Sequence, residues 1–443
     1  MVSREWTNNE REIKIAFSSS TITVFVQLPN VSFRVFNLKI IYLHQYFNTP
    51  SMSGGTRSYE MARRLVDMGH EVHMITSWRG DCRNSDWFIT NEDGITVHWF
   101  PVEYSNSFND FQRVLAFIKF LIAVTRRCWS MSADLVFATS TPLTIAIPGY
   151  LTSKRLSIPM VFEVRDLWPT LPIAIGSLNN PFLRWLAFKL ERFAYFNSSQ
   201  VIALSDGMKD GVVATGYDSH QVHVIPNSCD LELFSVSDDG EASSRFRADN
   251  NISENAKLIV YCGTFGRING VDYLVDLAST LSDVPDLYFL AIGEGAEFDN
   301  VAELAELRGV LNKNFRLLPS VSKAEMPNIL AAADLATSLF IPLKEMEANS
   351  ANKFFDALAA GLPVLLNYGG WQSKLLVENE AGLQLDRDIK VAADQLRQVL
   401  SDSQKIGRWG VNARYLGESQ FSRDDLALKL EHVFKEAVNE SVH

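Results

Sequence analysis

The sequence predicts an α/β protein made of two doubly wound, Rossmann-like halves. Short apolar runs alternate with helical stretches along most of the chain, which is typical of parallel sheets covered by helices. The first expected strand of each half, residues 38–44 and 258–262, is followed by a loop that contains glycines. Glycines at that position let the backbone come close to a bound ligand, so each half is expected to carry part of a binding site.

Length and composition restrict the classes of protein that fit. A chain of 443 residues is too long for one hydrophobic core, which predicts two or three domains. The contents of 47% hydrophobic and 21% charged residues are those of an ordinary globular protein with a large core. The net charge of −11 argues against nucleic acid as a partner.

The cysteine spacing and the start of the chain indicate the expected compartment. Cys82, Cys128, Cys229 and Cys262 lack C-x-x-C spacing, which indicates a reducing compartment, no disulfide framework and no zinc site. Polar residues and a proline interrupt the apolar run at 21–37, and no signal peptide is recognisable, so neither a membrane span nor a leader is expected. Residues 1–37 are expected to form an extension outside the fold.

The first half opens with a strand, a glycine loop, a helix and a second strand. The loop holds Ser53, Gly54 and Gly55, the helix spans about 56–68 before Gly69, and the second strand spans 70–76. The loop is not G-x-G-x-x-G and no acidic residue closes the second strand, which argues against a nicotinamide dehydrogenase. Further strands are expected at 95–102, 135–138, 160–164, 200–203 and 222–225. Helices are expected at 111–127, after the loop at 140–142 to about 155, and at 182–196.

The second half follows a polar run at 235–255 that marks a domain junction. Its glycine loops are Gly263 to Arg267 after the first strand and Gly293-Glu294-Gly295 after the second. Strands are expected at 258–262, 287–292, 315–317, 335–339 and 362–366, and helices at 271–281, 323–332, 351–360 and through the tail from 390 onward.

The stretch at 348–370 combines a helix, a tight turn, a core strand and a glycine loop. Ser350 is the expected N-cap, and Gly361 the expected helix stop. Lys353 lies in the first helical turn, where a lysine and the helix N-terminus together favour an anion such as phosphate. Asp356 follows on the same face and could accept hydrogen bonds from sugar hydroxyls. The alternative is a solvated Lys353–Asp356 pair on an exposed helix.

The strand at 160–164 ends in a polar cluster. It delivers Glu163, Arg165, Asp166 and Trp168 to the carboxyl edge of the sheet, where open α/β sheets place their ligands. Two carboxylates and an arginine beside a tryptophan suit a polar substrate. The alternative is an ion-paired loop with no substrate role.

These motifs resemble those of a known family. The segments GTFGR, GEG and DALAAGLPV are similar to those of retaining glycosyltransferases of family 4, which have the GT-B fold of two Rossmann-like domains facing a cleft. The segments LHQYFNTPSMSGGTRSYEMARRL, FEVRDLWP and NSANKFFDALAAG resemble the bacterial O-antigen and capsule branch, which includes N-acetyl-L-fucosamine transferases. The resemblance covers residues 38–435.

The resemblance implies roles for the second half. Asp356 matches the second acid of the E-x7-E motif, which holds the ribose hydroxyls, whereas the first acid is replaced by Ala348 and Glu347 is one residue out of register. Arg267 matches the arginine that binds the diphosphate. The lysine that usually follows it is Asn269 here, so Lys353 is expected to supply the second cation.

The resemblance also implies an activity, namely transfer of a sugar from a UDP-linked donor to a lipid-diphosphate-linked saccharide with retention of configuration. The domains are expected at 38–225 on the acceptor side, at 226–405 on the nucleotide-sugar side, and at 406–443 as helices returning to the first half. Arg165-Asp166 stands where relatives carry a His-Asp step near the acceptor. No D-x-D motif is present at the place expected for a metal, so neither a metal nor another cofactor is expected. The catalytic candidates are Glu163, Arg165 and Asp166, and the donor-binding candidates are Gly54, Gly55, Gly263, Arg267, Asn269, Gly293, Glu294, Ser350, Asn352, Lys353 and Asp356.

Two other functions stay open at this stage. A UDP-N-acetylhexosamine 2-epimerase shares the architecture and would need acid–base groups for the C2 proton. A non-catalytic nucleotide-sugar-binding subunit would account for the missing first acid of E-x7-E.

Two expected helices suggest a membrane surface as a partner. Residues 111–127 carry four cations and no acid, and residues 182–196 combine aromatic side chains with three cations. Such helices bind anionic lipid through apolar burial and charge, so the enzyme is expected in the cytoplasm, peripheral on the inner face of the membrane. The alternative is that both helices cover the first sheet.

Overall fold

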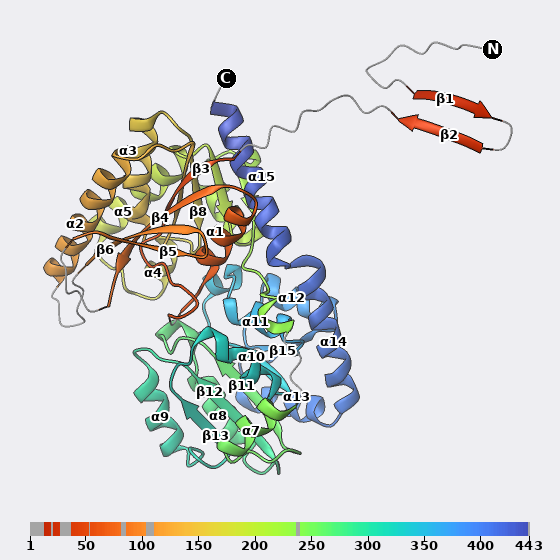
Figure 1. The fold of residues 1–443 in the computed structure, drawn as a ribbon. Coiled ribbons are helices and arrows are strands. Elements are labelled where there is room, and N and C mark those ends of the chain that lie inside the picture. Colours follow the sequence, from red (N-terminus) through yellow and green to blue (C-terminus); the bar gives the residue numbers. More distant parts are fainter. Residues whose placement is uncertain are drawn as a thin grey trace. The chain divides into compact units, whose positions relative to one another are not determined.

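The structure is a computed structural model that describes residues 13–18, 21–26, 37–52, 54–80, 86–102, 110–235 and 240–441 (Figure 1). Side chains are described from residue 37 onward, apart from those of residues 110–117. Ser53, Cys82, residues 236–239 of the polar run and the Arg113 side chain therefore lie outside the described part. The chain forms two compact units, Met1–Asn37 and Leu38–His443. In the first unit, β1 (Ile13–Ser18) pairs antiparallel with β2 (Thr21–Val26).

The first half of the second unit is built on an eight-stranded sheet in the order β10-β9-β8-β7-β3-β4-β6-β5. The strands run parallel except β5, which pairs antiparallel with β6 at the edge. The strand order reverses beside β3, and ligands of doubly wound folds bind at that place. The strands are β3 (Lys39–Leu43), β4 (Glu71–Trp78), β5 (Phe88–Glu92), β6 (Ile95–Pro101), β7 (Leu135–Thr139), β8 (Met160–Val164), β9 (Gln200–Ala203) and β10 (Val222–Val224).

Burial on both faces explains the apolar strands of this sheet. Along β3, Ile40 and Tyr42 pack into one core cluster, whereas Ile41 and Leu43 pack into the cluster on the opposite face. Helices cover both faces. They include α1 (Arg57–Asp67), α2 (Asp110–Trp129), α3 (Ala146–Leu156), α5 (Pro181–Phe196) and α6 (Asp206–Ala214). The short helix α4 (Thr170–Ala174) instead packs on the second half through Leu171.

The second half is built on a six-stranded parallel sheet in the order β13-β12-β11-β14-β15-β16. Its strands are β11 (Lys257–Cys262), β12 (Leu287–Ile292), β13 (Phe315–Leu318), β14 (Leu335–Ser338), β15 (Val364–Leu366) and β16 (Gly382–Gln384). The helices are α7 (Glu241–Asp249), α8 (Asp272–Thr280), α9 (Phe298–Leu307), α10 (Met326–Ala331), α11 (Asn352–Ala359), α12 (Trp371–Glu378), α13 (Ile389–Leu400), α14 (Ser403–Gln420) and α15 (Arg423–Ser441).

The last two helices contact different halves. Helix α14 packs on α11 of the second half, and α15 packs on the first sheet, where the Phe434 ring lies 4.9 Å from that of Phe137. The turn between them therefore crosses from one half to the other beside the segment that follows β10.

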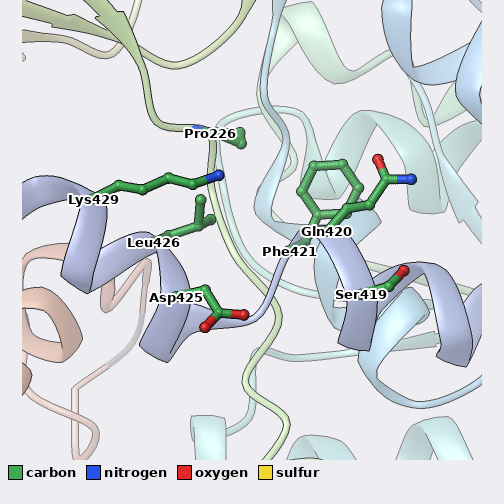
Figure 2. A pocket seen from close by; sticks show the side chains of 7 residues that line it. All are labelled: Pro226, Ser419, Gln420, Phe421, Asp425, Leu426 and Lys429. Carbon is green, nitrogen blue, oxygen red and sulfur yellow. The ribbon is translucent and has the colours of Figure 1, made fainter. Parts of the chain in front are cut away.

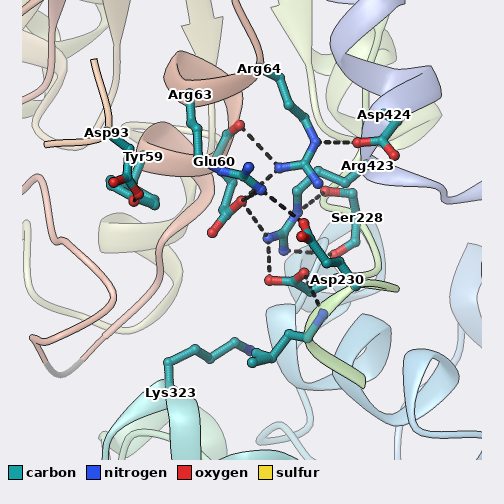
Figure 3. A network of polar contacts seen from close by, with 12 residues as sticks. Tyr59, Glu60, Arg63, Arg64, Asp93, Ser228, Asp230, Lys323, Arg423 and Asp424 are labelled. Atoms are coloured by element: carbon teal, nitrogen blue, oxygen red, sulfur yellow. Dashed lines mark hydrogen bonds and ion pairs between the residues drawn. The ribbon is translucent and has the colours of Figure 1, made fainter. Parts of the chain in front are cut away.

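Two segments cross between the halves, namely the segment after β10 and the turn between α14 and α15, and we call them the crossing segments. A polar network connects both of them to α1 (Figure 3). Arg423 donates to Asp230 at 2.7 Å and to the Ser228 hydroxyl at 3.1 Å, and it lies 3.5 Å from the Glu60 carboxylate. Glu60 also accepts from Arg64 at 2.6 Å. These side chains are buried, so charges and hydrogen bonds compensate one another where water is excluded.

Most predicted elements are confirmed, several of them to the residue. Strands β8, β9 and β12 have the predicted bounds, and Gly361 takes a φ of +69° directly after α11. The prediction missed β5, which joins β6 through the left-handed Asp93-Gly94 turn, a recognisable hairpin signal. It also missed α4, α6, α7, α9, α12 and β16, which are short or carry glycine or polar residues.

Candidate active site

The predicted site residues gather at the carboxyl edges of the two sheets and at the start of α11. Gly55 follows β3, and Asn352 is the first residue of α11 in the other half. A Cβ atom added to Gly55 would lie 2.9 Å from Asn352 Nδ2 and 4.0 Å from Arg165 Nη2. The structure thus brings together groups from three of the predicted motifs.

Lys353 is the central cation of this region. Its Nζ donates to the Tyr261 hydroxyl and to Asn269 Oδ1, both at 3.0 Å, and it lies 4.5 Å from the centre of the Tyr261 ring. Burial lowers the pKa of Lys353 to about 7, since no carboxylate of the described residues pairs with it. A half-buried lysine with only neutral partners is prepared to bind an anion.

The two glycine loops of the second half pack backbone against backbone beside this lysine. A Cβ at Gly263 would lie 3.2 Å from the Lys353 side chain, and one at Gly293 would clash with the Gly263 carbonyl oxygen. Gly293 and Gly295 also have positive φ values. Glycine is therefore required in these loops by space as well as by conformation. Glu294 is exposed between them, and its carbonyl oxygen accepts from the Phe265 N–H.

Arg267 and Asn269 lie in one short turn after β11. Asn269 is buried and holds Lys353, whereas Arg267 is exposed and makes no hydrogen bond or ion pair with another described residue. The guanidinium of Arg267 is thus available to a ligand at the edge of the sheet.

The predicted N-cap of α11 is wrong by one residue. The helix begins at Asn352 after Ala351, because Ser350 is engaged elsewhere: its hydroxyl accepts from the Asn227 N–H at 3.1 Å. None of the described side chains caps the α11 N-terminus, so the N–H groups of Asn352 and Lys353 remain for a ligand. Ser350 thus lies beside the site and links α11 to the crossing segment.

Asp356 pairs with a lysine that the sequence analysis did not consider. Its Oδ1 lies 2.6 Å from Nζ of Lys323, and both side chains are largely shielded from solvent. The alternative of a solvated Lys353–Asp356 pair is not what the structure shows, because each residue has another partner.

Packing explains why Ala348 replaces the first acid of E-x7-E. The Ser205 hydroxyl donates to the Ala348 carbonyl oxygen at 2.6 Å, and a Cβ at Gly207 would lie 2.9 Å from Ala348 Cβ. The start of α6 therefore covers the position that a carboxylate would need. Glu347 is exposed, and its Oε1 lies 3.6 Å from where a Cβ at Gly369 would be, next to the loop after β15.

Glu163 has a structural partner on each oxygen. Oε1 accepts from Arg57 at 2.8 Å and Oε2 accepts from the Thr139 hydroxyl at 2.6 Å. Burial would raise the pKa of Glu163, but Arg57, Arg165 and the Thr139 hydroxyl outweigh burial and keep that pKa below its usual value. Arg57 also donates to the carbonyl oxygen of Ile225 at 2.9 Å. The ion-pair alternative therefore holds for Glu163, and a catalytic role for it stays a prediction.

Arg165 and Asp166 are more exposed to solvent than Glu163. Asp166 Oδ2 accepts from the Thr141 hydroxyl at 3.3 Å, and burial raises the Asp166 pKa. Arg165 is half-buried and donates through Nη1 to His44 Nε2 at 3.1 Å. His44 was missed although it is the last residue of the predicted strand at 38–44, where polar residues mark a site. Tyr261, inside a strand, gave no such signal.

One cavity lies away from these residues (Figure 2). It has a volume of about 610 Å³ and is lined at the turn between α14 and α15 by Pro226, Ser419, Gln420, Phe421, Asp425, Leu426 and Lys429. It borders the crossing segments and contains none of the predicted site residues.

Comparison with known families decides the class of protein. Residues 54–228 match the model of the glycosyl transferase 4-like domain, and residues 242–415 match that of glycosyl transferases group 1. The two matches are consecutive, correspond to the two halves, and together cover most of the chain. The chain is a GT-B glycosyltransferase of family 4.

Relatives of this glycosyltransferase are distant but extend over most of its length. WcaI of Escherichia coli (strain K12), whose name assigns it to colanic acid biosynthesis, is 24% identical over 65% of this chain and 73% of its own. N-acetyl-alpha-D-glucosaminyl L-malate synthase of Bacillus anthracis is 21% identical over 88% of this chain and 96% of its own.

Solved structures support the fold of the glycosyltransferase. Anabaena HepE in complex with UDP and glucose matches with a TM-score of 0.67 at 17% identity, covering 90% of this chain and all of HepE. WaaG, a glycosyltransferase involved in lipopolysaccharide biosynthesis, matches with a TM-score of 0.65 at 18% identity, covering 89% and 99%.

The described residues form neither a metal-ion cluster nor a membrane-spanning helix. They contain no group of three or more His, Cys, Asp or Glu side chains that could hold a metal ion. Among the helices that the structure describes, none is long and apolar enough to cross a membrane.

Proposed function

We propose that this glycosyltransferase moves a sugar from a UDP-linked donor to a lipid-diphosphate-linked saccharide, with retention of configuration and without a metal. The observation that carries the proposal is Lys353, a half-buried cation whose partners among the described residues are neutral. It lies in the first turn of the uncapped helix α11, beside the glycine loop that begins at Gly263. A diphosphate fits this set of groups, because it needs both backbone N–H donors and positive charge.

The groups around Lys353 suit departure of a nucleoside diphosphate. Negative charge builds up on the diphosphate as the bond to the sugar breaks, and Lys353, Arg267 and the α11 N-terminus would stabilise that charge. Asp356, held by Lys323, would accept hydrogen bonds from the ribose hydroxyls. Gly54 and Gly55 would let the first half approach the donor closely.

The acceptor would bind on the first half. Its hydroxyl loses a proton as the new bond forms, and we assign Asp166 to hydrogen-bond that hydroxyl. Burial raises the Asp166 pKa, which makes this carboxylate a better proton acceptor.

The names of relatives support the choice of donor and pathway. Structures of HepE contain UDP or UDP-glucose, and the names of two curated relatives refer to N-acetylglucosaminyl groups. WcaI is assigned by its name to colanic acid biosynthesis. An N-acetylated amino or deoxy sugar in O-antigen or capsule synthesis is therefore our proposal for the product.

A membrane surface would bring the lipid-linked acceptor to the enzyme. On α5, Phe182 is 66% exposed and Trp185 is 55% exposed. Lys189 lies 5.9 Å from the Trp185 ring, so cations border the aromatic side chains. On α2, Ile118 and Ile122 are also exposed. Apolar side chains mixed with cations favour anionic lipid, which supports a cytoplasmic enzyme peripheral on the inner face of the membrane.

The test of the reaction is product formation with defined substrates. The purified chain would be incubated with a panel of UDP-sugars, with and without a lipid-diphosphate-linked saccharide, and the products analysed by mass spectrometry and NMR. We expect one UDP-sugar to yield an extended lipid-linked product with the donor's anomeric configuration. Conversion of UDP-N-acetylhexosamine in the absence of acceptor would instead identify an epimerase, and UDP-sugar binding without turnover a binding subunit.

A further inference from the structure

We infer that Arg165, held in place by His44, is the cation through which the first half binds the terminal phosphate of the nucleoside diphosphate. In this inference, which rests on the proposed function, Arg165 contacts the ligand and His44 is a positioning residue. The diphosphate would then be bound from both halves, by Lys353 on one side and Arg165 on the other.

The two residues come from strands on either side of β7. His44 directly follows β3 and Arg165 directly follows β8, and the sheet order β8-β7-β3 places both at one carboxyl edge. Arg165 Nη1 lies 3.1 Å from His44 Nε2. Because a guanidinium only donates, His44 Nε2 must accept, and the imidazole is then neutral with its proton on Nδ1.

The surroundings of His44 agree with a neutral imidazole. The side chain is 3% exposed, and burial together with the charges of Arg165 and Arg79 holds the His44 pKa well below its usual range. His44 Nδ1 is buried without a partner among the described residues. Burying a polar atom without a partner costs free energy. This cost is expected where a residue serves to orient another.

Arg165 keeps most of its hydrogen-bonding capacity. Its side chain makes no ion pair with a described carboxylate within hydrogen-bond distance, and the imidazole occupies one of its two Nη groups. Arg57, near the same carboxyl edge, has its donors occupied, because it binds the Glu163 carboxylate and two carbonyl oxygens. Five N–H donors make arginine suited to a phosphate, so the free ones of Arg165 are the expected contact.

The position of Arg165 points to the donor diphosphate. Gly55 is close to both Arg165 and Asn352, because a Cβ atom added to it would lie 4.0 Å from Arg165 Nη2 and 2.9 Å from Asn352 Nδ2. Asn352 opens α11 and is followed by Lys353, so Arg165 faces the start of the helix that would receive the phosphate. A phosphate oxygen in the space beside Gly55 would be within reach of both halves.

The experiment compares UDP with UMP, which lacks the terminal phosphate. Calorimetry would measure both ligands on wild type, Arg165→Ala, His44→Phe and His44→Gln, with Arg245→Ala as the control for loss of a remote arginine. We expect Arg165→Ala to weaken UDP about tenfold to hundredfold and UMP hardly at all. His44→Phe should weaken UDP in the same selective way, whereas His44→Gln, which keeps an acceptor oxygen, should retain most of the affinity.

Several outcomes would overturn the inference. Equal losses of affinity for UDP and for UMP would show a general binding defect. Thermal unfolding of the ligand-free variants identifies a folding defect. Unchanged UDP binding with a raised KM for the lipid-diphosphate acceptor would assign Arg165 to the acceptor phosphate instead. If Lys353→Ala weakens UDP while Arg165→Ala does not, only this inference fails. If wild type does not bind UDP, the proposed function fails.

Discussion

Arg57 and Lys353 are cations shielded from water near the carboxyl edges of the two sheets. They differ in whether a carboxylate compensates the positive charge. Arg57 is 3% exposed and is compensated by the Glu163 carboxylate and by carbonyl oxygens of the crossing segment. Among the residues that the structure describes, the partners of Lys353 are a hydroxyl, an amide oxygen and aromatic rings, without a carboxylate. The charge of Arg57 thus stabilises the fold, whereas the charge of Lys353 is available to a ligand.

Breaking the compensated pair should have the largest effect. Glu163→Gln removes the negative charge and leaves Arg57 buried without a counter-ion, which typically costs about 3–5 kcal/mol. Urea denaturation should show this loss in the free energy of unfolding. The matched control is Glu241→Gln, which breaks the exposed Arg245–Glu241 pair and should change stability by less than about 1 kcal/mol. Equal effects of the two variants would remove the distinction on which the comparison rests.

Removing the uncompensated charge should stabilise the ligand-free protein. The Lys353 pKa is about 7 in the folded chain against 10.5 for a free lysine, so the unfolded state binds more protons between these values. Wild-type stability from this residue therefore rises with pH across that window. Lys353→Met should be more stable than wild type near neutral pH by roughly 1–2 kcal/mol, a value discounted because the side chain is half-buried. The difference should shrink as pH approaches 10.5. A variant less stable than wild type at neutral pH would contradict this account.

The same residue should make UDP binding depend on pH. Bound diphosphate favours the charged lysine, so binding requires proton uptake above the free-protein pKa of about 7. UDP affinity should fall by up to about tenfold per pH unit above that value. Calorimetry in buffers of different ionisation enthalpy measures the uptake, which should be absent in Lys353→Met. Uptake that persists in the variant would assign the proton to another group.

The smallest effect is expected from the N-terminal unit. Residues 1–36 precede Leu38–His443, which forms a compact unit of its own. Deleting them should change the free energy of unfolding by less than about 0.5 kcal/mol, as for changes away from the core. A large loss of stability or of UDP affinity on deletion would show that residues 1–36 contribute to the fold or to the binding site.

Local patterns were sufficient for the fold and for the elements that carry the candidate site residues. The apolar strand at 160–164 and the glycine loops have few alternatives, because buried parallel strands and close backbone contacts require those residue types. Partners of the site residues could not be predicted in the same way. Nothing in the sequence shows that Arg57 binds Glu163, that Asn227 takes the Ser350 hydroxyl, or that Lys323 reaches Asp356. These contacts join residues more than thirty positions apart, so they depend on tertiary structure.

The central claim is that Lys353 binds the diphosphate of the donor, and a UDP titration of wild type and Lys353→Met tests it most directly. The variant keeps the length and apolar character of the side chain while removing the charge. We expect UDP affinity to fall about tenfold to hundredfold, the loss of a charge-assisted contact, while the variant remains folded in thermal unfolding. Wild-type affinity in a folded Lys353→Met variant would contradict the claim.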